Sequence, residues 1–199
     1  MWYNNCVGKI DIIHYIDSVD STNNEISRWV LEKKLELVNY TSLVAHEQLS
    51  GRGRGHHAWF SKPGKSLTMS TYIKIPNTHF WRTNISEVML ISATACLNAL
   101  KTLVPKEQFD NLGFRIKKPN DIYIKNKKVA GILGELISSN YVDDPFIECV
   151  VGIGLNVALT EDELPFANAT SLLIEGFEIM NFFEKFPKRY MKELSQYFN

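Results

Sequence analysis

Short apolar segments alternate with amphipathic segments along this chain, and the pattern predicts both strands and helices. Residues 10–16 are apolar and rich in β-branched side chains, which is typical of a buried strand. Residues 67–75 alternate between apolar and polar side chains, the period of a strand with one buried face. The same criteria predict further strands at residues 43–46, 114–117, 122–124, 129–137 and 146–157.

Apolar residues at helical spacing predict at least two helices. The stripe over residues 86–103 is the most regular in the chain. Another helix is expected to begin near Asn23, because Thr22 and Glu25 have the spacing of a capping box.

The last segment, residues 183–198, also has helical spacing. Pro187 fits a helix there only if the helix begins close to that residue. Runs of strands with two or three helices indicate the α+β class, in which a mixed β-sheet is covered by helices. A length of 199 residues fits one domain, so residues 1–199 are interpreted as a single unit.

Charge and cysteine content narrow the possible functions. Lys and Arg number 22 and Asp and Glu number 22, so no net charge draws the whole protein toward DNA, RNA or an anionic membrane. Cys6, Cys96 and Cys149 lie far apart without neighbouring ligands, which excludes a disulfide scaffold and a zinc site. No segment reaches the roughly 18 apolar residues of a membrane span, and the expected compartment is the cytoplasm.

A glycine- and arginine-rich segment, residues 51–55, is the first candidate for binding chemistry. In an extended backbone Arg52 and Arg54 project to one side, where two guanidinium groups can clamp a phosphate or carboxylate. The glycines would let backbone amides approach the same anion. Taken alone, the segment favours a solvated basic loop over a clamp. His56 and His57 beside it favour solvated side chains over metal ligands.

A Lys-Lys-Pro-Asn-Asp run follows a predicted strand. Pro119 biases Lys118 toward an extended backbone, so Lys117 and Lys118 are expected on opposite faces, and one of them can point inward. An inward lysine would stabilise negative charge on a reacting carboxylate and phosphate. Asn120 and Asp121 would offer polar partners to a nucleotide or its magnesium ion. Without further context, Pro-Asn-Asp favours an ordinary turn.

Glycines interrupt two predicted strands, at Gly131 and Gly134 and at Gly152 and Gly154. Glycine weakens a strand interior unless a ligand or another backbone needs the space, so a flat ligand against the sheet would explain them. A pair of strand-bending bulges explains them equally well. The Gly152-x-Gly154 pair lacks a third glycine that opens a helix, which excludes the dinucleotide-binding fingerprint.

The order and spacing of these motifs resemble the biotin protein ligases, which attach biotin to a lysine of an acceptor carrier domain. The family pattern contains Ser-Thr-Asn at a helix start, Gln-x-x-Gly-Arg-Gly-Arg followed by Trp and Ser, Lys-Trp-Pro-Asn-Asp, Lys-x-x-Gly-Ile-Leu-x-Glu and Gly-Ile-Gly-x-Asn. The matching residues here are Ser21, Thr22, Asn23, Gln48, residues 51–54, Trp59, Ser61, Lys117, residues 119–121, Lys128, residues 131–133, Glu135, residues 152–154 and Asn156.

The resemblance implies a class II synthetase-like biotin/lipoate ligase catalytic domain that uses biotin, ATP and Mg²⁺. The biotin carboxylate would attack the α-phosphorus of ATP, giving biotinyl-5′-AMP and pyrophosphate. A lysine of a biotin carboxyl carrier protein or domain, as in acetyl-CoA carboxylase, would then displace AMP. In such ligases the Arg-Gly loop orders over the adenylate, which is consistent with an anion clamp.

The resemblance also implies the roles of individual residues. Arg52 and Arg54 would neutralise phosphates, and Lys117 would hold the carboxylate and stabilise charge at phosphorus; these three would be catalytic. The biotin side would comprise Ser21, Thr22, Asn23, Gln48, Gly51, Arg52, Gly53, Arg54, Lys117, Gly131 and Gly154. The nucleotide side would comprise Arg52, Arg54, Trp59, Asn120, Asp121, Lys128 and Asn156. No resident metal site is implied.

This sequence departs from the family pattern at several points. Lys118 replaces the usual tryptophan, residues 55–57 replace Arg-Gly-Arg, and Gly134 stands where a larger apolar residue is common. No helix-turn-helix segment precedes residue 10, so DNA binding is not expected, and the chain ends where most relatives continue into a small β-barrel. Monomer and homodimer are both open.

Two alternative functions remain at this point. A lipoate ligase or octanoyltransferase would share the fold and the acyl chemistry, but those relatives have different glycine and histidine motifs. A non-catalytic biotin-binding relative would keep the fold and the ligand site without turnover.

Overall fold

The computed structural model describes residues 13–32, 37–55, 57–137 and 144–198. Seven strands form a mixed sheet in the order β1-β2-β3-β7-β6-β5-β4, which confirms the predicted architecture. β1 pairs with β2 in parallel, and the other neighbours pair antiparallel. The strands are β1 (Ile13–Val19), β2 (Ser42–Gln48), β3 (Ser66–Pro76), β4 (Phe114–Lys117), β5 (Asp121–Ile124), β6 (Lys127–Leu136) and β7 (Phe146–Asn156).

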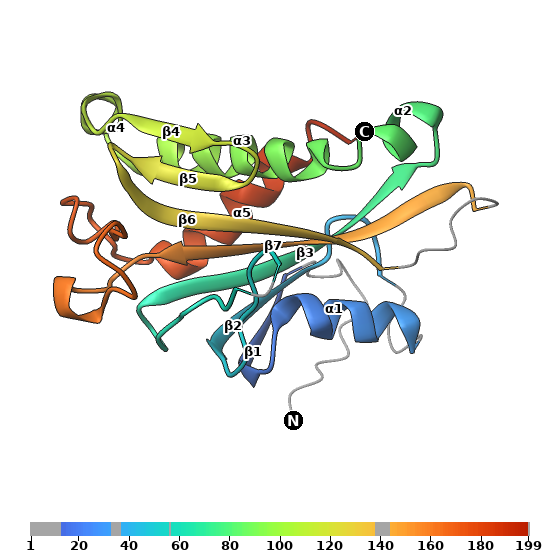
Figure 1. Ribbon diagram of the computed structural model, residues 1–199, viewed down its shortest axis with the longest axis horizontal. Helices are drawn as coiled ribbons and strands as arrows, with labels where there is room; N and C mark the ends of the chain where they lie inside the picture. Colours follow the sequence, from blue (N-terminus) through green and yellow to red (C-terminus); the bar gives the residue numbers. More distant parts are fainter. Residues whose placement is uncertain (1–12, 33–36, 56, 138–143, 199) are drawn as a thin grey trace.

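Helices cover the two faces of the sheet unequally (Figure 1). Helices α3 (Glu87–Leu103) and α5 (Phe182–Leu194) pack together over one face and enclose the main core. Helix α1 (Thr22–Leu31) lies on the opposite face, where Ile26 packs on Leu43, Tyr72 and Val150.

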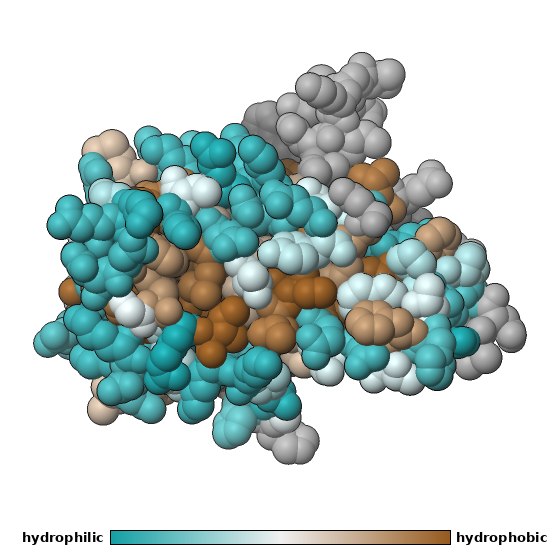
Figure 2. All heavy atoms as spheres, turned by 90° about the horizontal axis from the view of Figure 1, so that it is seen from above, coloured by the Kyte–Doolittle hydropathy of each residue, from teal (hydrophilic) through white to brown (hydrophobic). Residues whose placement is uncertain are grey.

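Three short helical segments complete the described fold: α2 (His79–Thr83), α4 (Lys106–Asn111) and a 3-10 turn, η1 (Glu161–Glu163). The sequence pattern did not predict them, because segments of three to six residues are too short to show a helical period. No helix in the described ranges is long and apolar enough to cross a membrane. From above, the end of the molecule around β4, β5 and α4 is mainly hydrophilic, and apolar residues gather nearer the middle (Figure 2).

The core between α5 and the sheet is built on aromatic residues spaced by four. The rings of Phe182, Phe186 and Tyr190 stack with centroids 5.3 and 6.2 Å apart, and Phe186 and Tyr190 are fully buried. The expected helix start near Pro187 is wrong, because α5 begins five residues earlier, at Phe182. Pro187 has no N–H for the carbonyl four residues before it, and burial of this aromatic row outweighs that missing bond.

The start of α1 differs from the predicted capping box. Ser21 is the N-cap residue, with φ −155°, and its side chain makes no capping bond. The Thr22 hydroxyl instead donates to the Gln48 side chain at 3.0 Å. Glu25 accepts a hydrogen bond from the indole N–H of Trp29 at 2.7 Å, so neither member of the predicted box serves the helix end.

Most strand predictions agree with the structure, and β4 matches its predicted bounds. β6 begins two residues earlier than expected, because a tight turn at Lys125 and Asn126, with φ +53° at Lys125, replaces the predicted four-residue turn. The predicted strand residues 10–12, together with Cys6 and His56, lie outside the described residues.

The two described cysteines, Cys96 and Cys149, are buried free thiols. Burial raises the pKa of Cys149 to about 12 and that of Cys96 higher still. Neither thiol is therefore ionised near neutral pH, and both act as small apolar core residues.

We expect Phe186→Ala to lower the free energy of unfolding by about 3–5 kcal/mol, because it removes a fully buried ring and leaves a cavity under the sheet. Phe166→Ala is the matched control: Phe166 is 47% exposed, and its truncation should cost less than about 1 kcal/mol. Urea titration followed by circular dichroism measures both. Equal losses would show that the α5 aromatic row does not hold this core together.

Candidate functional site

A cavity of about 250 Å³ opens on the sheet face that α1 partly covers. The start of α1, residues 51–55 (the Gly-Arg loop) and the first residues of β5 and β6 form its walls, and β6 and β7 form its floor. The predicted site residues that line it are Ser21, Thr22, Asn23, Gln48, Arg52, Gly53, Arg54, Trp59, Asn120, Asp121, Lys128, Gly131 and Gly154. Residues separated by more than one hundred positions in sequence thus share one cavity.

The floor of the cavity requires glycine. A Cβ atom at Gly154 would lie 2.1 Å from the indole of Trp59, and one at Gly152 would lie 2.4 Å from Oδ1 of Asn23. β6 and β7 pair without a register shift through this region, so the interpretation of the glycines as bulges is wrong. The glycines instead let other groups approach the bare strand backbone.

Gly134 has a different environment on the opposite face of the sheet. Its Cβ would lie 2.9 Å from Cγ of Met89, a residue of α3. The methionine side chain occupies the space that a larger residue at position 134 would take. This departure from the family pattern is therefore a feature of core packing and leaves the ligand side unchanged.

A row of hydrogen-bonded polar groups crosses the floor of the cavity. Gln48 Oε1 accepts from the backbone N–H and the hydroxyl of Thr22, at 2.8 and 3.0 Å. The Ser70 hydroxyl lies 2.6 Å from both Thr22 Oγ1 and Asn23 Oδ1. Asn23 Nδ2 then donates to Glu135 Oε2 at 2.7 Å. The row runs from the end of β2 to β6 and fixes the orientation of each polar group.

Two members of this row were not predicted as site residues. Ser70 is fully buried and stands opposite Gly152 in the β3–β7 register. In the sequence it is one of several polar positions in an alternating strand, so only the pairing register distinguishes it. Glu135 was quoted as part of a motif without a role, and the structure places its carboxylate between Asn23 and Arg52.

The two arginines of the loop share the cavity but reach different partners. Arg52 forms an ion pair with Glu135 at 2.6 Å, and Arg54 donates to Oδ1 of Asn120 at 3.3 Å. The expected convergence of both side chains on one point is therefore not observed. The backbone turns at Gly55, with φ +64°, and is not extended as the prediction assumed.

Trp59 lies flat over the glycine floor. Its ring is within 3.1 Å of the position of a Cβ at Gly131 and faces Lys128, whose Nζ is 5.6 Å from the ring centroid. The indole N–H is buried, and no described residue accepts its hydrogen bond. Lys128 also pairs with Asp121 at 2.7 Å. An aromatic surface, an unused donor and a paired cation thus meet at this end of the cavity.

Lys117 and Lys118 are both exposed, so the expectation that one lysine points inward is wrong. The physical reason is that β4 is the last strand of the sheet that the described residues form. Lys117 does lie on the ligand face, because pairing places it in one cross-strand row with Asp121, Gly131 and Gly154. Its Nζ is 3.4 Å from the Tyr123 hydroxyl and does not line the cavity.

Two more predicted residues lie outside this cavity. Asn156 is buried at the end of β7, where its amide donates to the carbonyl of Thr170 at 3.0 Å. Gly51 lines an adjoining cavity on the outer side of the loop, together with Gly55 and Glu135. A Cβ at Gly51 would lie 2.5 Å from the carbonyl oxygen of Trp59, so this glycine lets the loop close on itself.

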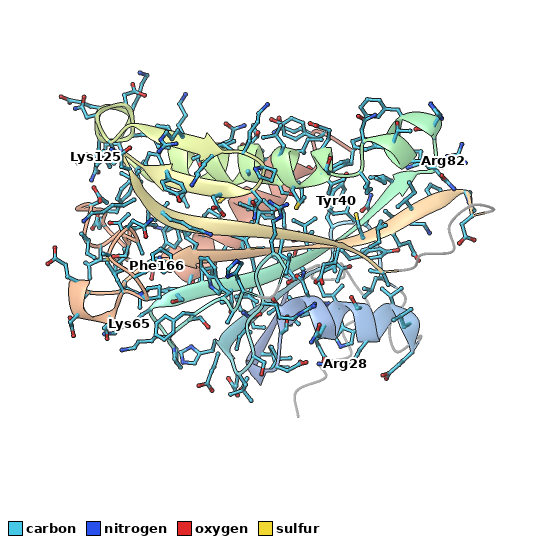
Figure 3. The ribbon with its side chains drawn as sticks, viewed as in Figure 1. Arg28, Tyr40, Lys65, Arg82, Lys125 and Phe166 are labelled. Atoms are coloured by element: carbon cyan, nitrogen blue, oxygen red, sulfur yellow. The ribbon has the colours of Figure 1, made fainter. Side chains whose placement is uncertain are left out.

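An ion pair stabilises the turn that leads into α1 at the cavity wall. Asp20 accepts from Arg28 at 2.7 and 3.1 Å and from Asn24 at 2.8 Å. The Arg28 guanidinium holds the pKa of the Asp20 carboxyl well below its usual range, so the carboxylate stays charged at neutral pH. Arg28 marks this position on α1 in Figure 3. Asp20 directly precedes Ser21, Thr22 and Asn23, so the pair ties the turn before these residues to α1.

Comparison with known proteins places this arrangement in one family. A sequence model of the Biotin/lipoate A/B protein ligase family matches residues 15–156. The chain is 31% identical over 162 residues to the Bifunctional ligase/repressor BirA of Escherichia coli, covering 79% of this chain and 44% of that protein. It is 30% identical over 134 residues to the Biotin–[acetyl-CoA-carboxylase] ligase of Mycobacterium tuberculosis, covering 67% of this chain and 45% of that protein.

A solved structure supports the same assignment. The biotin protein ligase from Aquifex aeolicus in complex with biotin and ATP aligns with a TM-score of 0.66 at 26% identity, covering 95% of this chain and 72% of that chain. The chain spans less than half the length of the two curated relatives. Because the family match includes the strands, the loop and the start of α1 that form the cavity, the chain belongs to the biotin/lipoate A/B protein ligase family.

Proposed function

We propose that this chain is the catalytic domain of a biotin protein ligase, which forms biotinyl-5′-AMP from biotin and ATP and transfers biotin to a carrier lysine. The observation that carries the proposal is the single cavity shared by the motifs of the Ser-Thr-Asn turn, the Gly-Arg loop and the glycine strands. The named activities of the relatives and the complex with biotin and ATP support it. The proposed acceptor is the carrier domain of acetyl-CoA carboxylase, and the proposed compartment is the cytoplasm.

The polar row on the cavity floor suits the urea head of biotin. A cyclic urea carries two N–H donors and one carbonyl acceptor, and Gln48, Thr22, Ser70 and Asn23 present both acceptors and donors held in place by one another. Oriented neutral groups of this kind give specificity inside a largely apolar pocket. The fused rings would lie beside Asn23, which packs on the backbone at Gly152.

The opposite end of the cavity suits the nucleotide. Arg52, Arg54 and Lys128 bring three positive charges to its walls, and the Trp59 ring and its free N–H can contact a base or ribose. Asp121 and Asn120 offer oxygen ligands of the kind that Mg²⁺ prefers, although described residues contain no group of three candidate ligands. Magnesium, held mainly by phosphate oxygens, would neutralise their charge.

The first step joins a carboxylate oxygen of biotin to the α-phosphorus of ATP, and pyrophosphate leaves. Negative charge concentrates at phosphorus, where Arg52, Arg54 and Lys117 would stabilise it. In the second step the neutral amine of an acceptor lysine attacks the acyl carbon and AMP leaves. The Gly-Arg loop would exclude water between the two steps, since an acyl-adenylate hydrolyses readily.

The urea-binding row also separates this proposal from a lipoate ligase. Lipoate and octanoate have no ureido group, so they would leave the buried hydroxyl and amide groups of Thr22 and Asn23 without ligand partners. A binding protein without turnover would not need Arg52, Arg54 and Lys117 to stabilise charge at phosphorus.

Biotin-dependent exchange of labelled pyrophosphate into ATP tests the proposal. We expect exchange with biotin and MgATP, and at least a hundredfold less with lipoate or octanoate. Mass spectrometry of a carrier domain should then show one added biotin. Exchange with lipoate alone would assign the lipoate branch of the family, and biotin binding without exchange would identify a binding protein.

We expect Lys117→Met to reduce exchange by roughly 10²–10³-fold, the usual effect of removing one charge that stabilises a transition state. Lys118→Met is the matched control, because it removes the same charge one residue later, outside the row shared with Gly131 and Gly154. It should change exchange less than threefold. The role given to Lys117 is wrong if the two variants behave alike.

Gly154→Ala should weaken biotin and ATP binding more than tenfold, because its methyl group enters the space now held by Trp59. Gly134→Ala adds the same methyl group to the neighbouring strand on the opposite face, where the movable end of Met89 meets it. Isothermal titration calorimetry compares the two. Equal affinities would show that the packing of Trp59 on Gly154 does not shape the ligand site.

A further inference from the structure

One serine of β3, Ser70, lies beneath the residues that open α1. Its side chain is fully buried and does not line the cavity. Strand pairing places it opposite Gly152, where the missing side chain lets Asn23 approach the sheet. The Ser70 hydroxyl therefore lies 2.6 Å from each of two cavity residues, Thr22 and Asn23. It can influence a ligand only through them.

The amide groups at the two ends of the polar row have fixed orientations. The backbone N–H of Thr22 can only donate, so the Gln48 atom 2.8 Å from it is the oxygen, Oε1. A carboxylate can only accept, so the Asn23 atom 2.7 Å from Glu135 is the nitrogen, Nδ2. Oδ1 of Asn23 is thereby turned toward Ser70. The row begins and ends in an acceptor.

Between these two acceptors, two hydroxyl protons serve three contacts. The contacts join Gln48 Oε1 to Thr22 Oγ1 at 3.0 Å, Thr22 Oγ1 to Ser70 Oγ at 2.6 Å, and Ser70 Oγ to Asn23 Oδ1 at 2.6 Å. Each hydroxyl carries one proton. When Thr22 donates to Gln48, the Ser70 proton serves either Thr22 or Asn23, and the other oxygen keeps an unfilled lone pair. The row lacks one donor.

The neighbouring hydroxyls of β3 do not supply the missing donor. Thr68 and Tyr72 flank Ser70 on the same face of the strand, two residues away on either side. Thr68 donates to the carbonyl of Ala45 at 3.0 Å, and the Tyr72 hydroxyl donates to the Glu148 carboxylate. Both protons are therefore already used, and neither residue can take the place of Ser70.

We infer that Ser70 is a positioning residue that makes the polar row selective for a ligand head group with an N–H donor. The inference rests on the proposed function and specifies how that site would recognise a ureido group. Ser70 donates to one of two cavity oxygens, and a ligand N–H supplies the proton that the other lacks. An alkyl or dithiolane head group would leave this buried acceptor unfilled, which is unfavourable.

The test compares Ser70→Ala with the unaltered protein by isothermal titration calorimetry. We expect S70A to weaken biotin binding about 10–100-fold, because Thr22 and Asn23 lose their buried donor. The KM for MgATP in pyrophosphate exchange, measured at saturating biotin, should stay within about twofold. A variant that merely loosened the cavity would raise both quantities.

Ser42→Ala is the matched control. Ser42 is also fully buried, and its hydroxyl lies 2.7 Å from the hydroxyl of Thr71. It is paired with Thr71, one residue along β3 from Ser70, so its side chain lies on the opposite face of the sheet. S42A removes the same atom from the same sheet and should change the affinity for biotin less than about twofold.

A ligand series separates the hydrogen bond from the shape of the cavity. Dethiobiotin keeps the ureido group without the thioether, so S70A should weaken its binding as much as it weakens biotin binding. Octanoate has no N–H group, and S70A should change its affinity, measured at millimolar concentration, less than about twofold. Ser70→Cys nearly keeps the side-chain volume but is a weaker donor. It should lose affinity for biotin and not for octanoate, which keeps the test decisive if S70A does not fold.

Each other outcome overturns the inference. Unchanged biotin affinity in S70A and S70C would show that the Ser70 proton does not serve recognition. Equal losses for octanoate and biotin would assign Ser70 to the shape of the cavity, and a loss for biotin without one for dethiobiotin would point to the thioether. An equal loss in S42A would indicate a general effect on the sheet. If the unaltered protein binds no biotin, the proposed function fails, whatever the variants show.

Discussion

The unbroken antiparallel pairing of β3, β7 and β6 is the constraint on which the rest of the site depends. Its register places Gly154 opposite Gly131, and it places Gly152 between Ser70 and Leu133, so backbone without side chains faces α1 and the Gly-Arg loop. The helices α3 and α5 bury the other face and hold these strands in place. Stability and ligand recognition are thus assigned to opposite faces of one sheet, and a substitution on one face can leave the other intact.

Charge inside the cavity is arranged so that the loop can exchange partners. Arg52 is neutralised by Glu135, and their side chains are 44% and 30% exposed. A pair this open to water contributes roughly 0–1 kcal/mol, so a phosphate group can replace the carboxylate at small cost. Asn23 Nδ2 donates to the same oxygen, Glu135 Oε2, at 2.7 Å, so Glu135 keeps this hydrogen bond when the arginine leaves. The polar row can therefore keep its contacts to one ligand while Arg52 exchanges Glu135 for a phosphate group.

The sequence predicted the parts of the molecule that depend on local pattern and motif. The alternation in β3 and the bounds of β4 follow from period and from turn residues, and the motifs identified most of the cavity lining. Ser70 was missed because its role arises from the register between strands that are distant in sequence. The exposure of Lys117 was missed because a strand pattern does not show whether a further strand lies beside it. The turn at Gly55 was missed because it depends on hydrogen bonds within the loop, such as the one from the Gly53 N–H to the His57 carbonyl.

The position of Lys117 on an edge strand is compatible with a part in phosphoryl chemistry. A lysine buried in a cavity without an anion would lose hydration without compensation, and its pKa would fall until it was neutral. At the edge, its side chain is exposed to water and its Nζ lies 5.1 Å from the ring centroid of Tyr123. Moving the ammonium group inward costs rotamer entropy of up to about 2 kcal/mol, and a bound triphosphate supplies the opposing charge. The lysine would then enter the site only when negative charge is present there.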